Sequence, residues 1–499
     1  MSHYLSKIIN KNFWKIILAI SFIELFSLIS FKFAWLSGFF FILIIIGVTL
    51  FTLYKLKYGL YIALIELMIG SYGYLFYLQL PEFKLPIRLG IFLTLFIIWL
   101  IKYFNWYKYT KLLKKNRLVQ NLVLFIIFLI IGVINGYLHG NGLKNIFFDV
   151  NGYLYFGLFF IFLDVFQSKK CIIEFLQIFI ASLIYLTFKI FLTLYFFTHG
   201  FNWLTDLFYT WIRDTRVGEI TWAGGSFYRI FIQSQIYSLI GVFITSLIII
   251  KFYKKQPNFK LLLKHKKFQF FFSLLIIIQT SILISFSRSF WLGGFVGAIG
   301  LFIYLITLYK TQIKKLAKTI AILLLGGILS IVLMITIVNF PIPEPGIFSA
   351  DTLKNRFTTG DAAASSRWNL LPVLLEQNKK APFWGTGFGT TVDYQTEDPR
   401  IKNEQNPQGW VTTFTFEWGY LDTITEIGIL GLLIYLIFIG QIFYLGIKSK
   451  LNNTIKWGLL IGLISIIITH TFSPYLNHPL GIGYLMLCAS LFSHIIDKK

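Results

Sequence analysis

Long runs of apolar residues recur along most of this chain, and short polar stretches separate them. Each run approaches the length of about 20 residues that an α-helix needs to cross the hydrocarbon core of a bilayer. The runs are continuous, whereas the strands of a membrane β-barrel alternate between apolar and polar residues. The pattern therefore predicts an all-α fold, a polytopic bundle of transmembrane helices.

Counting the runs predicts about 12–14 spans, because the first two runs are also compatible with a single re-entrant hairpin. The expected spans are residues 14–31, 34–54, 59–78, 89–103, 118–135, 146–163, 172–196, 228–250, 270–285, 290–309, 316–339, 421–447, 457–472 and 480–495.

One long stretch, residues 340–420, is not continuously apolar, and we expect it to form a large extracytoplasmic loop domain. The shorter stretch 202–227 is rich in aromatic residues and is expected to lie in the membrane interface as an amphipathic segment. The expected organisation has four parts: residues 1–267 (transmembrane helices with the outer loop 202–227), 268–339 (transmembrane helices), 340–420 (the large loop) and 421–499 (C-terminal transmembrane helices).

The chain has 499 residues, with 45 Lys and Arg against 21 Asp and Glu, and its formal net charge is +24. A net charge this high is compatible with a nucleic-acid partner. The basic residues, however, are concentrated in short loops around residues 102–117, 251–267, 310–318 and 448–456. Cytoplasmic loops of membrane proteins carry this excess of Lys and Arg. The pattern favours a bacterial cytoplasmic-membrane protein that contacts lipid and no nucleic acid, with both termini in the cytoplasm and the 340–420 loop outside.

Residue types that bind metals are sparse. The chain has two cysteines, Cys171 and Cys488, and its His, Cys, Asp and Glu residues do not show the spacing of a metal site. We therefore expect neither a metal nor an organic cofactor.

Two arginines stand where polar turns meet expected helices. Ser287-Arg288-Ser289 (the Ser-Arg-Ser turn) lies between two spans, and its serines can cap the second of them. Ser366-Arg367 is arranged in the same way, with Arg367 in the first turn of the next helix. A helix N-terminus with an arginine beside it favours an anion. Both arginines are candidate anion-binding residues, and the alternative for each is a surface arginine that reaches for water.

Three side chains near the outer ends of the C-terminal spans can take a proton from a hydroxyl group. Glu417 precedes a helix in an aromatic setting, where partial desolvation would suit a carboxylate for general-base catalysis. His470 and His478 flank the next outer turn and are alternative bases, although histidines in such places are more often structural.

Other polar residues have simpler expected roles. Asp422 and Glu426 are expected to complement the dipole of the helix that they begin. Lys189 lies within an apolar run and needs a partner, for which Asp149 is a candidate. The run Gly385-Thr-Gly-Phe-Gly389 predicts a glycine-rich turn, with a spacing that is not that of a Walker loop.

The order of these motifs resembles that of the Wzy-type O-antigen ligase and polymerase family of bacterial envelope proteins. The turn at Arg288 is similar to the family's Ser-Arg-Gly turn. Arg367, followed by Pro382-Phe-Trp-Gly-Thr-Gly-Phe-Gly, is similar to the family's stretch of one proline and three glycines. Tyr420-Leu, followed by Glu426-Ile-Gly-Ile-Leu-Gly-Leu, is similar to its final Glu-x-Gly-x-x-Gly run.

The resemblance covers roughly residues 270–491 and implies a GT-C-like integral membrane glycosyltransferase. The implied donor is a glycan linked to undecaprenyl diphosphate, and the acceptor is a hydroxyl group of a glycan, a lipid or a protein. The resemblance also implies that Arg288 and Arg367 bind the diphosphate. Arg213 and Arg216, in the aromatic segment, are added as further candidates for this role.

The chain departs from the family at one position. The family's ligases commonly carry His-Asn before the last motif, with the histidine as the base, and this chain has Glu417-Trp418 there. Either Glu417 replaces the histidine, or the base lies elsewhere, or the chain belongs to a polymerase branch. A transporter or flippase for lipid-linked oligosaccharides is the alternative function, although it should show paired repeats and broken helices.

Overall fold

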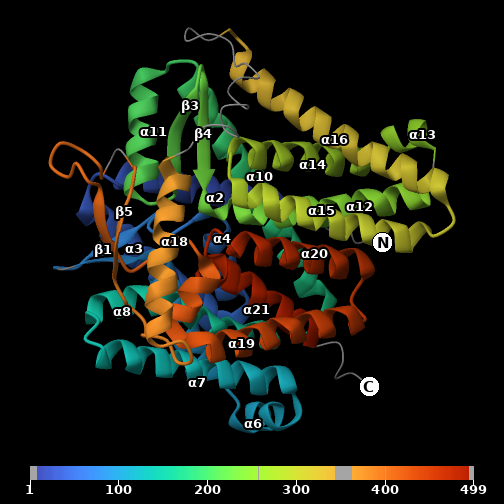
Figure 1. Cartoon of the computed structure of the whole chain (residues 1–499). Helices are drawn as coiled ribbons and strands as arrows, with labels where there is room; N and C mark the ends of the chain where they lie inside the picture. The colour runs from blue at the N-terminus through green and yellow to red at the C-terminus, as the bar shows by residue number, and fades with distance from the viewer. Residues whose placement is uncertain (1–7, 82, 257, 343–361, 399–400, 494–499) are drawn as a thin grey trace. The chain divides into compact units, whose positions relative to one another are not determined.

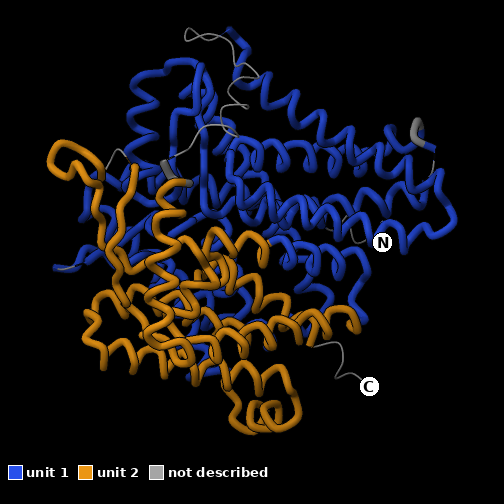
Figure 2. The backbone as a smooth tube through the Cα atoms, in the orientation of Figure 1, with its two compact units in different colours: residues 1–103, 160–353, 450–465 blue, residues 104–159, 354–449, 466–499 orange. Residues whose placement is uncertain are grey.

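The computed structural model describes residues 8–81, 83–256, 258–342, 362–398 and 401–493, and these are mostly helical (Figure 1). The chain divides into two compact units (Figure 2). Unit 1 comprises residues 1–103, 160–353 and 450–465, and unit 2 comprises residues 104–159, 354–449 and 466–499.

Unit 1 contains most of the long helices and two β-hairpins. Its helices are α2 (Lys11–Ser30), α3 (Ala34–Tyr54), α4 (Leu56–Ile69), α5 (Ile87–Ile98) with the π-helix η1 (Trp99–Tyr103), α10 (Lys169–Thr198), α11 (Asn202–Asp214), the 3-10 turn η3 (Gln233–Gln235), α12 (Ile236–Lys255), α13 (Phe259–Leu263), α14 (Lys266–Ile284), α15 (Arg288–Tyr309), α16 (Ile313–Asn339) and most of α20 (Asn453–His470). Its antiparallel hairpins pair β1 (Tyr77–Gln79) with β2 (Lys84–Pro86), and β3 (Gly218–Gly224) with β4 (Phe227–Ile232).

The core of unit 1 lies around α10 and α12. Helix α10 packs against α2, α4 and α14, and α12 packs against α14 and α15. Helices α12, α14, α15 and α16 run side by side (Figure 1). The outer faces of α15 and α16 expose large apolar side chains such as Phe295 and Leu324. Such faces suit lipid, because lipid tails are as apolar as the side chains that meet them.

Unit 2 is built around α19. Its elements are α6 (Trp106–Lys115), α7 (Arg117–Leu138), α8 (Leu143–Val150), the 3-10 helix η2 (Asn151–Gly157), α18 (Ala362–Lys380), the hairpin of β5 (Val392–Gln395) and β6 (Trp410–Thr413), α19 (Gly419–Lys448), the end of α20, the 3-10 turn η4 (Tyr475–Asn477) and α21 (Pro479–Ser493). Helix α9 (Leu158–Val165) crosses the boundary between the units in the sequence. Helix α19 packs against α7, α18 and α21.

Eleven helices among the described residues are long and apolar enough to cross a membrane. A twelfth is counted if residues 87–103 and 106–115, which are bent by 100°, form one span. A polytopic helical membrane protein is thereby confirmed. The first two apolar runs form two helices, α2 and α3, and each of them is long and apolar enough to span the membrane by itself.

One expected span, residues 59–78, differs from the helix that forms there, which is α4. Helix α4 ends at Ile69, and the backbone then turns through Gly73, whose φ is 88°, into β1. The expected span 59–78 is therefore wrong in its second half. Apolar content alone does not reveal where a glycine turn ends a helix.

The expected start of the span 228–250 is also wrong. The apolar residues up to Ile232 form β4, because they pair in register with β3 and do not continue the helix. The aromatic segment before them is amphipathic, as expected, but it divides into α11 and β3. Helix α11 buries Phe208 and Trp211 on one face and exposes Trp203.

The described part of the expected loop 340–420 does not form a separate domain. Helix α18 and the β5–β6 hairpin belong to unit 2, where they share a small core of Leu370, Leu374, Val392 and Phe416. Residues 343–361 of the expected loop lie outside the described part of the chain.

Candidate functional site

The glycine-rich turn that follows α18 is packed backbone to backbone within unit 2. Gly385, Gly387 and Gly389 have φ values of 73°, 93° and 76°, a region that favours glycine. A Cβ atom on Gly387 would collide with the backbone of Gly136 in α7. A Cβ atom on Gly389 would lie 2.7 Å from the backbone nitrogen of Ile146 in α8. Side chains are absent here because the backbones of neighbouring elements occupy the space.

Helix α19 is broken at Gly428, where φ is 72° and ψ is 177°. A break leaves backbone N–H and C=O groups without partners in their own helix, which is costly inside a membrane. The glycine-rich turn provides those partners. The N–H of Gly387 donates to the carbonyl of Thr425 at 3.2 Å, and the N–H of Ile429 donates to the carbonyl of Pro382 at 2.9 Å. The glycine-rich turn and the break at Gly428 therefore stabilise each other, and we call the two together the glycine lock.

Three carboxyl groups lie beside the glycine lock. Asp422 and Glu426 of α19 are buried, and Asp149 of α8 is half-buried. The hydroxyl of Tyr153 donates to Glu426 at 2.5 Å, and the N–H of Gly389 donates to Asp149 at 2.8 Å.

The two acidic residues of α19 differ from each other. Asp422 lies in the first turn, as expected, and accepts a hydrogen bond of 2.9 Å from the side-chain amide of Asn477. Its other oxygen, Oδ1, is buried without a hydrogen bond among the described residues. Glu426 lies one turn deeper and is bonded to Tyr153, so its expected role at the helix terminus is wrong.

Two predicted site residues meet on the surface of unit 2. Arg367 forms an ion pair with Glu417, and the indole N–H of Trp418 donates to the carbonyl of Arg367 at 2.9 Å. Half of the Glu417 side chain is exposed, so the expected desolvation is not found. Helix α18 already includes Ala362, which places Arg367 beyond its first turn and overturns the expected capping by Ser366.

His470 is fully buried at the end of α20, next to Tyr420. Its Nδ1 accepts a hydrogen bond of 3.2 Å from the backbone N–H of Leu476, which leaves the ring proton on Nε2 when the imidazole is neutral. The nitrogen that would take a proton is therefore already in use. His478 lies at the end of η4 and is half-buried.

The Ser-Arg-Ser turn lies in unit 1 at the start of α15. Ser287 occupies the N-cap position, as expected, but its side chain does not cap the helix and instead shares a hydrogen bond of 3.0 Å with the hydroxyl of Ser289. Arg288 is the first helical residue and is half-buried. Arg229 of β4 donates from its Nε to the carbonyl of Ser285 at 2.9 Å. Arg229 thus lies beside this turn, and its Nη1 atom also pairs with Glu219 of β3 at 3.9 Å.

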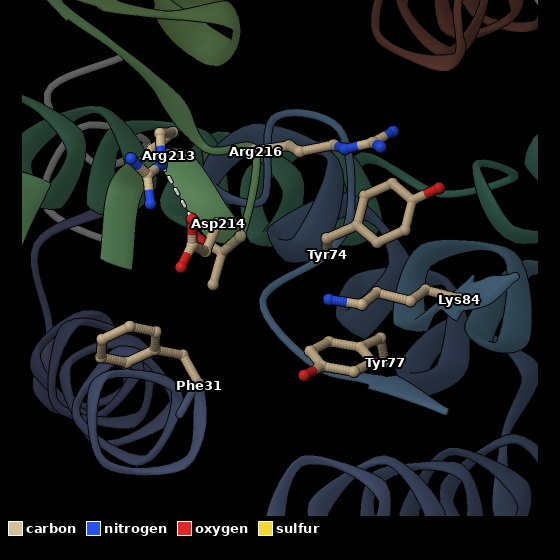
Figure 3. A pocket seen from close by; sticks show the side chains of 8 residues that line it. Phe31, Tyr74, Tyr77, Lys84, Arg213, Asp214 and Arg216 are labelled. Carbon is tan, nitrogen blue, oxygen red and sulfur yellow. Dashed lines mark hydrogen bonds and ion pairs between the residues drawn. The ribbon is translucent and has the colours of Figure 1, made fainter. Parts of the chain in front are cut away.

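Arg213 and Arg216 line a pocket of about 320 Å³ in unit 1 (Figure 3). Lys84, Tyr74 and Tyr77 line it as well, and Arg288 does not. Arg216 lies over the ring of Tyr74 at 5.0 Å, and Lys84 lies over the ring of Tyr77 at 4.3 Å. Burial raises the pKa of the Tyr74 hydroxyl, and the positive charge of Arg216 opposes that rise.

Lys189 is paired with Glu24 at 2.6 Å, and both side chains are buried. The expected pairing of Lys189 with Asp149 is therefore wrong. Glu66 and Arg88 form a second buried pair at 2.7 Å. Each acidic partner is visible in an apolar run of the sequence, but only the fold shows which helices meet.

The helices and these polar sites define a multi-pass membrane protein whose arginines flank polar turns. Within the described residues, three or more His, Cys, Asp or Glu side chains do not gather in a way that could hold a metal ion. Residues 270–436 match the family model described as O-antigen ligase, Wzy_C, so the chain carries a domain of this O-antigen ligase family. The resemblance drawn from the motifs is confirmed, and the family implies a glycosyltransferase with lipid-linked glycan substrates. No curated protein matches the chain.

Proposed function

We propose that this protein polymerises or ligates undecaprenyl-diphosphate-linked oligosaccharides on the outer face of the cytoplasmic membrane, in the biosynthesis of O-antigen or another surface polysaccharide. The observation that carries the proposal is the Ser-Arg-Ser turn inside the matched domain. A helix of 22 residues begins at Arg288, and the guanidinium of Arg229 is bonded to the carbonyl of Ser285, just before this turn. A helix N-terminus with guanidinium groups beside it favours a diphosphate.

The departure of the diphosphate needs few other groups in the donor site. A lipid diphosphate is a good leaving group once its negative charge is neutralised, and Arg288 and Arg229 supply positive charge where that negative charge develops. We propose that the enzyme does this without a metal. Transfer that continues unchanged in the presence of EDTA would support this, and restoration of lost activity by added Mg²⁺ would contradict it.

The acceptor hydroxyl needs a base, and the Arg367–Glu417 pair offers one. A diphosphate has more charge and more acceptor oxygens than a carboxylate, so it competes with Glu417 for the guanidinium of Arg367. Glu417, once released, takes the proton of the acceptor hydroxyl. The hydroxyl oxygen then bonds to the anomeric carbon of the donor, and the bond from that carbon to the diphosphate breaks. The lipid diphosphate leaves, and the proton passes from Glu417 to water.

His478 is the second choice for the base, because Nδ1 of His470 already accepts the N–H of Leu476. The proposal also places both termini in the cytoplasm and the residues around Glu417 outside. The distribution of Lys and Arg in the loops supports this orientation.

The test is transfer of glycan in proteoliposomes that contain a purified lipid-diphosphate oligosaccharide and its acceptor. Wild type is compared with Arg288→Ala, Arg367→Ala and Glu417→Gln, and each variant is first shown to be folded by its melting temperature. Arg117→Ala is the matched control, because Arg117 is also the first residue of a helix but lies outside the matched domain.

Transfer by wild type and by Arg117→Ala, with loss of transfer in the other three variants, is the expected result. Loss in the arginine variants alone would move the base to His478. Movement of the intact lipid between leaflets without transfer would contradict the proposal and favour a flippase.

A further inference from the structure

The end of α11 carries an arginine where glycine is favoured. The N–H of Arg216 donates to the carbonyl of Arg213, and the N–H of Val217 donates to the carbonyl of Ile212, both at 3.0 Å. These two bonds form the Schellman motif that ends many helices, and they place Arg216 at its left-handed position, with φ of 51°. An L-residue other than glycine costs about 1 kcal/mol there. The backbone at this position would therefore be more stable with glycine than with arginine.

The side chain of Arg216 lies at the pocket described above. Arg213 and Asp214 stand on one side of this pocket, and Arg216, Tyr74 and Lys84 stand on the other (Figure 3). Its walls come from segments that are far apart in the sequence, so the hollow is built by the fold of unit 1. Its volume lies at the lower end of the range for small-molecule sites.

The lining combines three kinds of group. Lys84, Arg213 and Arg216 are cations, Tyr74 and Tyr77 present aromatic rings, and Asp214 contributes a carboxylate that accepts a hydrogen bond of 2.9 Å from Arg213. A site for a bare diphosphate has no use for a carboxylate, which repels it. A sugar uses all three, because its apolar face packs on aromatic rings, its hydroxyls donate to carboxylates, and an acidic substituent pairs with cations.

We propose that this pocket binds an acidic sugar unit, one that carries a carboxylate or a phosphate, of the glycan on which the enzyme acts. This proposal rests on the proposed function for the identity of the glycan. It reassigns Arg213 and Arg216 from the diphosphate to the sugar chain. The pocket selects the substrate by its charge, and the transfer chemistry belongs to other residues.

The test measures binding and does not depend on transfer. Full-length protein in nanodiscs of neutral lipid is titrated with three soluble probes: a glucuronic-acid-terminated disaccharide, the same disaccharide ending in glucose 6-phosphate, and the same disaccharide ending in glucose. Wild type is expected to bind at least one acidic probe about tenfold more tightly than the neutral probe, the effect of one charge-assisted contact. The preference should shrink as salt is added, since the cations of the pocket are exposed.

The variants separate charge from folding. Arg216→Gly removes the cation and suits the left-handed backbone, so it should melt no lower than wild type and lose most of the preference. Arg216→Lys keeps both charge and strain and should retain the preference. Lys84→Gln should weaken it, whereas Lys318→Gln, a change at an exposed lysine that does not line the pocket, should leave it unchanged.

Two further arms identify the source of the anion. Inorganic diphosphate that binds as tightly as the acidic sugars, and is equally sensitive to Arg216→Gly, would overturn the proposal in favour of a diphosphate site. Nanodiscs that contain phosphatidylglycerol and block the acidic sugars would instead assign the pocket to lipid headgroups. Equal binding of all three sugar probes would also overturn the proposal that the pocket binds an acidic sugar. A protein that passes these tests yet transfers no glycan would leave the pocket standing and refute only the proposed function.

Discussion

The glycine lock of unit 2 and the Ser-Arg-Ser turn of unit 1 both lie in the stretch that matches the O-antigen ligase family, yet they are built in opposite ways. In the glycine lock, backbone meets backbone, and backbone hydrogen bonds join the glycine-rich turn to α19 on both sides of Gly428. At the Ser-Arg-Ser turn, charged side chains stand at a helix N-terminus that its N-cap side chain does not cap.

This difference suggests how to interpret motifs in membrane proteins. Glycines that recur in a motif can be required by a backbone contact within the fold. An arginine in a polar turn costs free energy near a membrane, and its presence points to a ligand. We expect damage to the glycine lock to lower stability, and damage to the turn to lower activity without lowering stability.

The largest effect is expected for Gly428→Ala. The substitution places a Cβ against the carbonyl of Phe383 and forces a residue other than glycine to a φ of 72°. We expect a loss of at least about 3 kcal/mol in the free energy of unfolding, enough to prevent recovery of folded protein. The measurement is the melting temperature and the monodisperse yield in detergent. Gly440→Ala, in the same helix and with open space around it, should be neutral. Equal behaviour of the two variants would show that the break does not need glycine.

Arg288→Ala should have the next largest effect, and it should be confined to activity. Loss of a group that stabilises developing charge is expected to slow transfer about 100- to 1000-fold. The melting temperature should stay close to that of wild type. The initial rate of transfer at saturating donor, together with the melting temperature, checks this. A variant that melts far below wild type would make the turn structural and remove the contrast with the glycine lock.

Tyr153→Phe tests whether the carboxyl groups beside the glycine lock are structural. The change leaves buried Glu426 without the hydroxyl that donates to it, which should cost about 1–3 kcal/mol. We expect a lower melting temperature and unchanged transfer at a temperature where the variant is folded. Tyr137→Phe, at an exposed position in α7, is the matched control. Loss of transfer without loss of stability would instead place this cluster in the catalytic machinery.

The smallest expected effect is a change in the pKa of the Tyr74 hydroxyl. The positive charge of Arg216 lowers the pKa of Tyr74 against the rise caused by burial, so Arg216→Gly should move that pKa further up. The measurement is ultraviolet absorbance of tyrosinate against pH, with Tyr74→Phe subtracted in each background. A titration that does not move would mean that the guanidinium does not lie over the ring in solution.

The membrane-spanning fold could be predicted from the sequence because hydropathy and length decide it locally. The ends of α4 and α12 could not, since a glycine turn and a strand pairing stop the helices there. The ion pair of Arg367 with Glu417 could not be predicted either, because nothing in the local sequence shows that α18 faces the start of α19. The same holds for Lys189, whose partner Glu24 lies in the first long helix.

The pair of Arg367 with Glu417 also has a kinetic consequence. If the base is occupied until the donor arrives, substrates must add in a compulsory order, the donor before the acceptor. An unreactive acceptor analogue should then inhibit uncompetitively with respect to the donor. Donor that is bound without acceptor should also be hydrolysed, but slowly. A single water molecule near the released carboxylate of Glu417 is held less firmly than the acceptor would be.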